Sequence, residues 1–323
     1  MAADSYRAFL SIFYPFYLAL SLIFQLFLIF LIIKHSPPTI HLLRILMILG
    51  CIFQLIMAFT TFFNQTRIVI TNSPMQIRSY GLCQSQEPWF CYIVYQIMEL
   101  STLATSLTCY GLFSLKYQVV TDKEVKKLSI VKSFVWFYSP LVLSVILVFY
   151  IIKNQTLSWD SQEQLYLLNK ILNANSDFIT IVSITFKKVP NVLNLMLFIF
   201  CFFMVPIMSL YSRKKILRQI NHRTENMSEA RQLLHKNFVM GLTIQCLLPY
   251  VFYIPLYIFY YYSIFTGKEF LFVEFFMTFL PQISSLLNPL IFMYFVIPYR
   301  EKLVLWSKRK RGEIRTNTAF ATS

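Results

Sequence analysis

The chain has 323 residues, of which 57% are apolar, 18% aromatic and 13% charged, and its formal net charge is +15. Soluble domains average about 45–50% apolar and about 25% charged residues, so this composition excludes a disordered tail protein and argues against an ordinary soluble enzyme. The apolar residues also come in blocks longer than a soluble core requires, which predicts a helical membrane protein with several spans.

Seven apolar runs are long enough to cross a membrane, because one span needs about 20 residues. We expect membrane helices at residues 10–33, 45–63, 91–115, 133–152, 189–212, 237–265 and 271–297. Barrel strands would be only about 9–11 residues long, so helices are preferred. The first run is too long for the apolar part of a signal peptide and should remain as a helix. The sequence therefore predicts an all-α membrane protein, with one seven-helix bundle over residues 1–297.

Lys and Arg are unevenly divided between the two sides of this bundle. If the N-terminus is outside, the inner segments carry 21 of the cations and the outer segments carry 8. Cytoplasmic loops carry an excess of cations, so we predict an outside N-terminus and a cytoplasmic tail over residues 298–323. Topology and attraction to anionic membrane lipid then account for the net charge, and no nucleic acid is expected as a partner.

The first outer loop contains a pair of cysteines. Cys83 and Cys91 lie on the oxidising side of the membrane, and seven residues separate them, which is enough to let their side chains meet. We predict a disulfide between them, and the alternative is two free thiols near the interface. The other four cysteines fall inside the predicted spans, where they are expected to pack as small apolar residues.

Two glycosylation sequons are predicted to lie outside the membrane. They begin at Asn64 and Asn154, each within a few residues of a helix end. A sequon is only an acceptor pattern, so both are candidates for glycosylation.

Two acids fall inside the predicted spans, where an ionisable group is costly and is a functional hypothesis by default. Glu99 lies about 12 Å below the outer end of the third span, at about 1.5 Å rise per residue. It is either a ligand contact at the floor of an outward-facing pocket or an acid hydrogen-bonded to a neighbouring helix. Glu274 lies one turn into the seventh span, where we expect its carboxylate to reach up to the lipid headgroups.

Aromatic residues near the outer ends of the last two spans are candidates for the pocket wall. Tyr253, Tyr257 and Phe276 are examples, and they favour an apolar or flat ligand. The alternative is simple packing between helices. Prolines recur in the same spans, and because a proline removes an i→i−4 hydrogen bond, it kinks the helix that contains it.

Basic residues mark the cytoplasmic side. The candidates for a partner-binding face are Lys116, Arg213, Lys214, Arg218 and Arg300. In the tail, Tyr299, Leu303 and Trp306 share one helical stripe flanked by cations, which predicts a short amphipathic helix on the membrane surface.

Enzyme signatures are absent from the sequence. It has no G-x-S-x-G, H-E-x-x-H, P-loop or G-x-G-x-x-G pattern, and no His pairs with a Cys at metal-ligand spacing. We therefore expect no catalytic activity, no cofactor and no metal.

Several motifs resemble those of G-protein-coupled receptors. Asn288-Pro289-Leu290-Ile291-Phe292 is similar to the NPxxY motif, with Phe in the Tyr place. Cys246-Leu247-Leu248-Pro249 is similar to the CWxP motif without its Trp. The third span ends in Leu115-Lys116-Tyr117, so the usual acid-Arg-Tyr switch is missing.

The resemblance is greater to the nematode serpentine chemoreceptors, above all to class delta. It rests on four features in order along the chain: Leu42-Leu43-Arg44, Gln65-Thr66-Arg67 followed by Gly81-Leu82-Cys83 and Cys91, Gln245 with Pro249 and Pro255, and Pro298-Tyr299-Arg300. The resemblance implies a receptor in the plasma membrane of a sensory neuron, and in its cilium, that binds a small-molecule odorant or pheromone and signals through a heterotrimeric G protein. By the same resemblance, Pro249, Asn288 and Pro289 would be pivots. The alternative function is an ion channel or transporter subunit.

Overall fold

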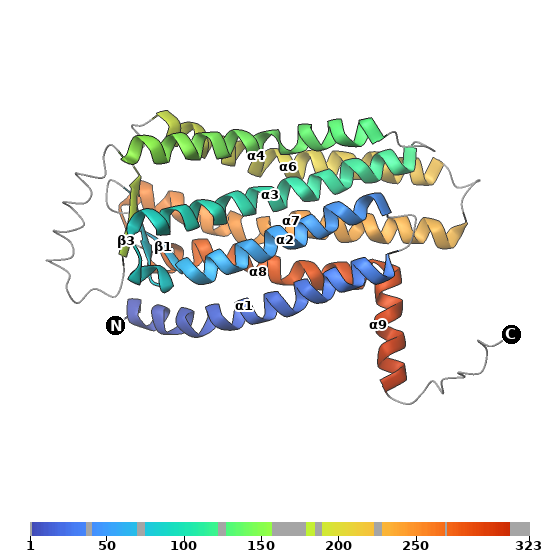
Figure 1. Cartoon of the computed structure of the whole chain (residues 1–323), viewed down its shortest axis with the longest axis horizontal. Helices are drawn as coiled ribbons and strands as arrows, with labels where there is room; N and C mark the ends of the chain where they lie inside the picture. Colours follow the sequence, from blue (N-terminus) through green and yellow to red (C-terminus); the bar gives the residue numbers. More distant parts are fainter. Residues whose placement is uncertain are drawn as a thin grey trace.

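Long helices dominate the structure, and most of them are longer than the predicted spans. The computed structural model describes residues 2–36, 41–69, 75–121, 127–156, 179–184, 189–222, 228–268 and 270–310. The seven long helices are α1 (Ala2–His35), α2 (His41–Asn64), α3 (Pro88–Thr121), α4 (Lys127–Thr156), α6 (Val189–His222), α7 (Glu229–Thr266) and α8 (Leu271–Phe295). They run side by side along the long axis of the molecule (Figure 1). This confirms the predicted fold class.

Six of these helices are long and apolar enough to cross a membrane, and α3 is the exception. Glu99, Lys116 and a series of Ser and Thr residues lower the hydropathy of α3. Its position explains this composition, since α3 packs against α2, α4, α6 and α7 in the middle of the bundle. By contrast, only 22% of the most apolar window of α4 is buried. The outer helix faces therefore present an apolar surface suited to lipid.

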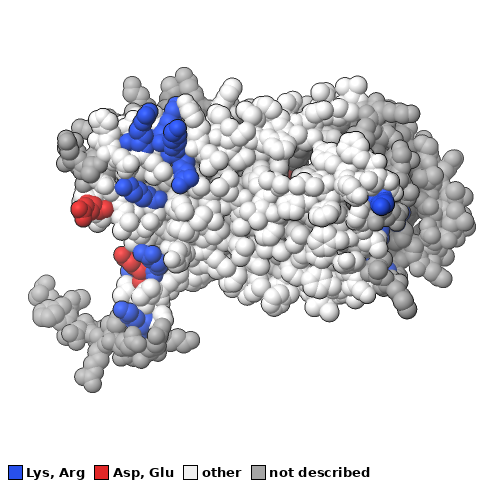
Figure 2. All heavy atoms as spheres, turned by 180° about the vertical axis from the view of Figure 1, so that it is seen from behind, with Lys and Arg blue, Asp and Glu red and all other residues white. Residues whose placement is uncertain are grey.

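Cationic side chains gather at one end of the bundle. On the face that Figure 2 shows, most of the Lys and Arg side chains lie at the end that carries α9 (Ile297–Lys310). This end also holds the end of α6 and the start of α7. The arrangement agrees with a positive inner side, and the orientation itself remains a prediction.

A small sheet lies at the opposite end, and the sequence analysis did not anticipate it. Strands β1 (Thr66–Val69), β2 (Met75–Ser79) and β3 (Ile179–Ile184) pair antiparallel in the order β1-β2-β3. Ile77 pairs with Ile68 on one side and Val182 on the other. The sheet therefore joins, through backbone hydrogen bonds, the two loops that are predicted to lie outside the membrane.

Close packing continues after the hairpin, where the chain enters the short helix η2 (Leu82–Ser85). A Cβ atom at Gly81 would lie 2.4 Å from the carbonyl oxygen of Phe63, so this approach of two backbones requires glycine.

Prolines inside the long helices leave backbone carbonyls without their helical donors, and neighbouring side chains replace those donors. Pro289 frees the carbonyl of Ser285, which accepts a hydrogen bond of 3.1 Å from Gln25 Nε2 on α1. Pro140 frees the carbonyl of Trp136, which accepts one of 2.9 Å from Ser139 Oγ. The kinks are thus tolerated as membrane helices require.

Helix α9 turns away from the bundle directly after α8 (Figure 1). Tyr299 is fully buried, and its hydroxyl shares a hydrogen bond of 2.7 Å with Ser36 Oγ. Burial raises the pKa of this phenol to about 12, so it stays protonated at physiological pH. The Trp306 ring lies 6.2 Å from the Phe27 ring. The stripe expected to face the membrane therefore packs in part against α1.

Candidate functional site

A cavity of about 790 Å³ occupies the middle of the bundle. Its walls come mainly from α2, α3, α6, α7 and α8, with Ile68 of β1 at its outer end and Phe292 of α8 towards the inner side. This volume lies within the range of about 300–1,000 Å³ that holds small ligands. Most of the lining side chains are apolar or aromatic, and a few polar groups stand among them.

Glu99 is the acidic residue among the cavity-lining side chains. Tyr95, one turn earlier on α3, lies beside its carboxyl group, so the carboxyl group has a hydroxyl neighbour on its own helix. Tyr253 and Tyr257 of α7 also line the cavity and lie close enough to Glu99 to interact with it electrostatically. Three of the four predicted pocket residues therefore share one wall of the cavity.

Phe276, the fourth predicted pocket residue, is not in the lining of this cavity. Its ring stacks on Phe272 at 4.6 Å and meets the edge of Tyr6 of α1 at 5.8 Å. The outer half of α8 turns this ring towards α1 rather than towards α3, so the structure does not support a place for Phe276 in this cavity. Phe276 packs a helix interface.

The three predicted pivot residues line the inner half of the cavity. Pro249 on α7 and Asn288 and Pro289 on α8 all belong to its lining. Gln245 Nε2 donates a hydrogen bond of 2.9 Å to the Asn288 carbonyl, which couples the two helices at this level. The Asn288 side-chain oxygen is buried without a hydrogen-bond partner.

Two cysteines that were expected only to fill space also stand in the cavity wall. Cys109 of α3 and Cys246 of α7 are both in the lining, and the Cys109 thiol donates a hydrogen bond of 3.8 Å to the Leu242 carbonyl of α7. They place α3 directly against α7 at the level of the pivots.

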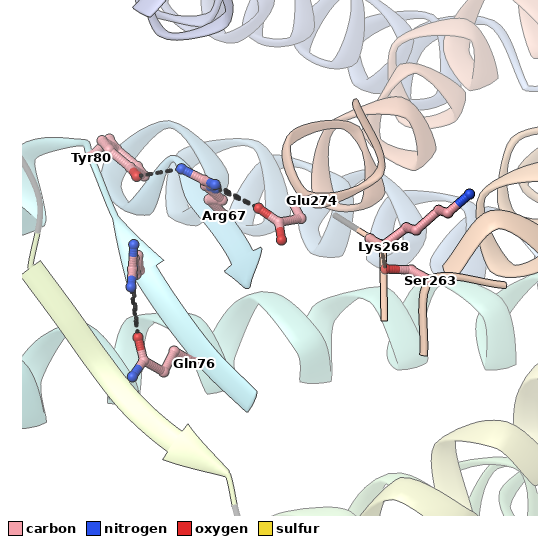
Figure 3. A network of polar contacts seen from close by, with 7 residues as sticks. Arg67, Gln76, Tyr80, Ser263, Lys268 and Glu274 are labelled. Carbon is pink, nitrogen blue, oxygen red and sulfur yellow. Dashed lines mark hydrogen bonds and ion pairs between the residues drawn. The ribbon is translucent and has the colours of Figure 1, made fainter. Parts of the chain in front are cut away.

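Glu274 does not reach the headgroup region as predicted. Only 2% of its side chain is exposed, and its Oε2 lies 2.6 Å from Nη2 and 2.9 Å from Nε of Arg67 on β1. Arg67 also donates to the Tyr80 hydroxyl at 3.3 Å, and its guanidinium lies 4.6 Å from the centre of the Phe275 ring. These contacts fasten β1 to α8 (Figure 3).

The two cysteines of the first outer loop are brought together but are free thiols in the structure. The Cys91 thiol donates to the Cys83 carbonyl at 3.1 Å, and the Cys83 thiol donates to Asn64 Oδ1 at 2.9 Å. The hydrogen bond with Cys91 and burial raise the pKa of the Cys83 thiol. The closeness of Cys83 and Cys91 supports the predicted disulfide, but the structure shows two free thiols. The disulfide therefore stays a prediction.

Asn64 is a poor acceptor for a glycan in this fold. Its side chain is completely buried, its oxygen is engaged by Cys83, and its side-chain nitrogen has no room for an attached sugar. The burial of Asn64 therefore argues against glycosylation of the folded chain at this site, which stays a prediction. The side chain of Asn154 lies outside the described residues.

One of the residues predicted for the cytoplasmic partner face is buried. Lys116 is only 1% exposed, because Phe238 of α7 covers its ammonium group at 4.6 Å from the ring centre. Lys214 and Arg218 are exposed on α6, whereas Arg213 and Arg300 are half-buried. Lys116 therefore cannot contact a partner while α7 keeps this position.

Some lining residues escaped the sequence analysis although the sequence carries a signal for them. On α3, polar side chains recur at helical spacing from Tyr92 and Gln96 through Glu99 to Thr102 and Ser106. Residues three or four apart lie on the same helix face, so this stripe predicts one polar wall. Gln282 and Ser285 of α8 lie in the lining as well, and with Asn288 they form a second polar stripe, at a spacing of three residues.

Comparison with known proteins agrees with the geometry. Residues 10–305 match the model of a family described as serpentine type 7TM GPCR chemoreceptor Srd. Three similar proteins from Caenorhabditis elegans are serpentine receptor class delta-40, delta-47 and delta-44. They are 35%, 31% and 29% identical to this chain, and the matches cover 95%, 95% and 98% of it and 95%, 96% and 99% of the relatives.

Proposed function

We propose that this chain, which belongs to the class delta family of serpentine seven-helix chemoreceptors, binds a small-molecule odorant or pheromone in the central cavity. Binding would change how α7 and α8 pack, and the change would reach the cytoplasmic end. As a multi-pass membrane protein of this family, it would act in the plasma membrane of a sensory neuron and in its cilium.

The observation that carries this proposal is the continuity of the cavity between Glu99 and the pivots. One end of the cavity holds Glu99 and two tyrosines, and the other holds Pro249, Asn288 and Pro289. A ligand near Glu99 therefore shares a wall with the residues that set the bend of α7 and α8. The ligand can shift the equilibrium between two packing states of α7 and α8 only by the difference between its affinities for those two states.

The inner end offers a surface for a heterotrimeric G protein. Lys214 and Arg218 are exposed there, and Lys116 lies under Phe238. A displacement of the inner end of α7 would uncover Lys116. Lys116 occupies the place of the arginine in the acid-Arg-Tyr switch of related receptors. Once uncovered, it would supply a cation to the partner.

The direct test is a ligand screen on cells that express the full chain, with calcium and membrane current recorded while G-protein signalling is intact or blocked. We expect a response that the block abolishes. A current that survives the block would instead place the chain among channels. Flux of the compound without any response would indicate a transporter.

Glu99→Gln then tests the cavity with any active compound. We expect a change in potency of about tenfold or more, equivalent to about 1.4 kcal/mol, with surface expression preserved. Glu87→Gln is the matched control, because Glu87 is exposed outside the bundle beside Trp89. Equal potency in wild type and Glu99→Gln would remove Glu99 from the binding site.

A further inference from the structure

The wall of the cavity between α6 and α7 is one side chain thick. Phe203 of α6 and Ile254 and Ile258 of α7 line the cavity, yet their side chains are 56%, 52% and 63% exposed on the outside of the bundle. In a membrane, the exposed sides of these helices face lipid. The same side chains therefore touch the cavity on one side and the bilayer on the other.

The outer surface of the molecule shows the same feature. On the face seen in Figure 2, the white surface, which belongs to residues other than Lys, Arg, Asp and Glu, is hollowed, and the red of an acidic side chain is visible inside the hollow. Glu99 is the acidic residue in the lining of the cavity. The cavity is therefore open towards the side of the bundle, at the level of the membrane.

The end of the cavity that faces the outer aqueous phase is covered in the described part of the chain. Ile68 of β1 belongs to the lining and is 9% exposed, and β2 and β3 extend the cover. The Arg67–Glu274 ion pair holds β1 on α8, and Thr278 Oγ1 donates a hydrogen bond of 2.8 Å to the Thr66 carbonyl. A buried ion pair and a hydrogen bond therefore hold β1 at this end of the cavity.

Side-chain motion is enough to admit a ligand from the side. Phe202 lies at the seam between α6 and α7, with its ring 4.5 Å from Tyr250 and 5.1 Å from Tyr253. Rotamer changes of exposed side chains take place in picoseconds to nanoseconds, far faster than the detachment of a sheet. The lateral route is therefore the easier one.

We propose that the cavity fills from the lipid bilayer through the seam between α6 and α7, and that its ligand is an apolar small molecule dissolved in the membrane. The idea that the bound molecule acts as a signal rests on the proposed receptor function. The route by which it enters depends only on the fold. It replaces the simpler expectation that an outward-facing pocket takes its ligand from water.

Two photoreactive probes test the route on the full-length protein in lipid nanodiscs. One is an alkyl diazirine that dissolves in the bilayer, and the other is a trimethylammonium diazirine that stays in water. After irradiation, peptide mass spectrometry measures the adducts on the α3 segment that contains Glu99. We expect the apolar probe to label this segment at least tenfold more than the charged probe. Similar labelling by both probes would overturn the proposal.

Variants locate the entrance. Ile258→Trp should narrow the seam and lower labelling by the apolar probe about fivefold or more. Ile146→Trp is the matched control, since Ile146 is 59% exposed on α4 and is not in the lining. Unchanged labelling in Ile258→Trp would rule out this seam. The two-probe comparison in the wild type needs no variant, so misfolding of a variant would not leave the route undecided.

The labelling requires no signalling, so the two proposals fail separately. If the apolar probe labels α3 but no membrane-soluble compound ever produces a response, the receptor function is wrong and the lateral route stands. If cells respond through this cavity to a charged compound, and only the charged probe labels α3, the receptor function stands and the lateral route is wrong.

Discussion

The hydroxyl of Tyr250 on α7 donates a hydrogen bond to the backbone carbonyl of Phe202 on α6. This carbonyl is the one that Pro206 leaves without a helical donor, because proline has no N–H to offer four residues later. Gln25 does the same for the carbonyl that Pro289 frees on α8. These kinked positions are therefore held by neighbouring helices, and a change of bend requires an exchange of hydrogen bonds.

Tyr250→Phe tests this arrangement. The substitution removes only the hydroxyl and leaves a buried carbonyl unsatisfied, so we expect a loss of about 1–3 kcal/mol in stability. The thermal midpoint of the purified receptor should fall by several degrees. Tyr150→Phe is the control, because Tyr150 is 52% exposed on α4 and should change little.

Pro206→Ala should rescue the Tyr250→Phe variant, because alanine restores an N–H donor to the Phe202 carbonyl. In the Pro206→Ala background, the loss of the Tyr250 hydroxyl should cost at most a few tenths of a kcal/mol, which a double-mutant cycle measures. An equal cost in both backgrounds would show that the hydrogen bond does not substitute for the one lost at the proline.

The ion pair between Arg67 and Glu274 gives a second prediction. Glu274→Gln leaves a largely buried guanidinium without its carboxylate, and breaking a buried pair costs about 3–5 kcal/mol. We expect β1 and β2 to detach and the hairpin to become sensitive to trypsin at Arg67 and Arg78. The pair replacement Arg67→Met with Glu274→Leu should recover most of the stability. Unchanged proteolysis in Glu274→Gln would show that the ion pair does not hold the sheet.

Asn64 should carry no glycan when the chain is made in a eukaryotic cell. Its side chain is fully buried and bonded to Cys83, so the folded outer loop does not present it to a glycosylating enzyme. Peptide mapping before and after enzymatic deglycosylation measures this directly. Conversion of Asn64 to Asp by the glycosidase would contradict the burial.

Cys83 and Cys91 should form a disulfide in the chain taken from the cell surface. Each thiol lies against the other residue in a buried cluster, on the side predicted to be oxidising. Alkylation without reduction should leave both residues unmodified and yield a linked peptide. Cys91→Ser should then lower the stability by about 2–4 kcal/mol, the usual effect of losing a bond of this kind. Recovery of two alkylated thiols would exclude the bond.

The sequence predicted the helices well because each span is a long apolar run with one physical explanation. It also placed Glu99, Tyr253 and Tyr257 near one another, since the spans and their depth are enough to do so. The strands were missed because they contain only four to six residues, and because β3 pairs with β2 about 100 residues earlier in the chain. Apolar and polar residues do alternate in Met75–Ser79, but five residues are too few to favour a strand over a loop.

The rotation of a helix about its own axis was the main quantity that the sequence left open. Phe276 and Tyr257 both stand in aromatic-rich stretches of the sequence. In the structure, Phe276 faces α1 and Tyr257 faces the cavity. Glu274 was assigned to the headgroups because its partner Arg67 lies 207 residues earlier, in a loop whose fold was unknown. Long-range pairs of this kind are visible only in three dimensions.

Lys116 provides the last prediction, because its ammonium group lies under Phe238 with a like charge nearby on Arg231. Burying a charge is unfavourable, so Lys116→Met should keep the volume and stabilise this packing of α3 against α7 by about 1–3 kcal/mol. If the signalling state exposes Lys116, the same variant should also weaken the response that the G protein carries. Lys214→Met, on the exposed face of α6, is the control for stability and should not change the thermal midpoint. Thermal midpoints of the purified variants and signalling in cells measure the two effects separately. A Lys116→Met variant that is less stable than the wild type would show that the buried ammonium group favours this packing.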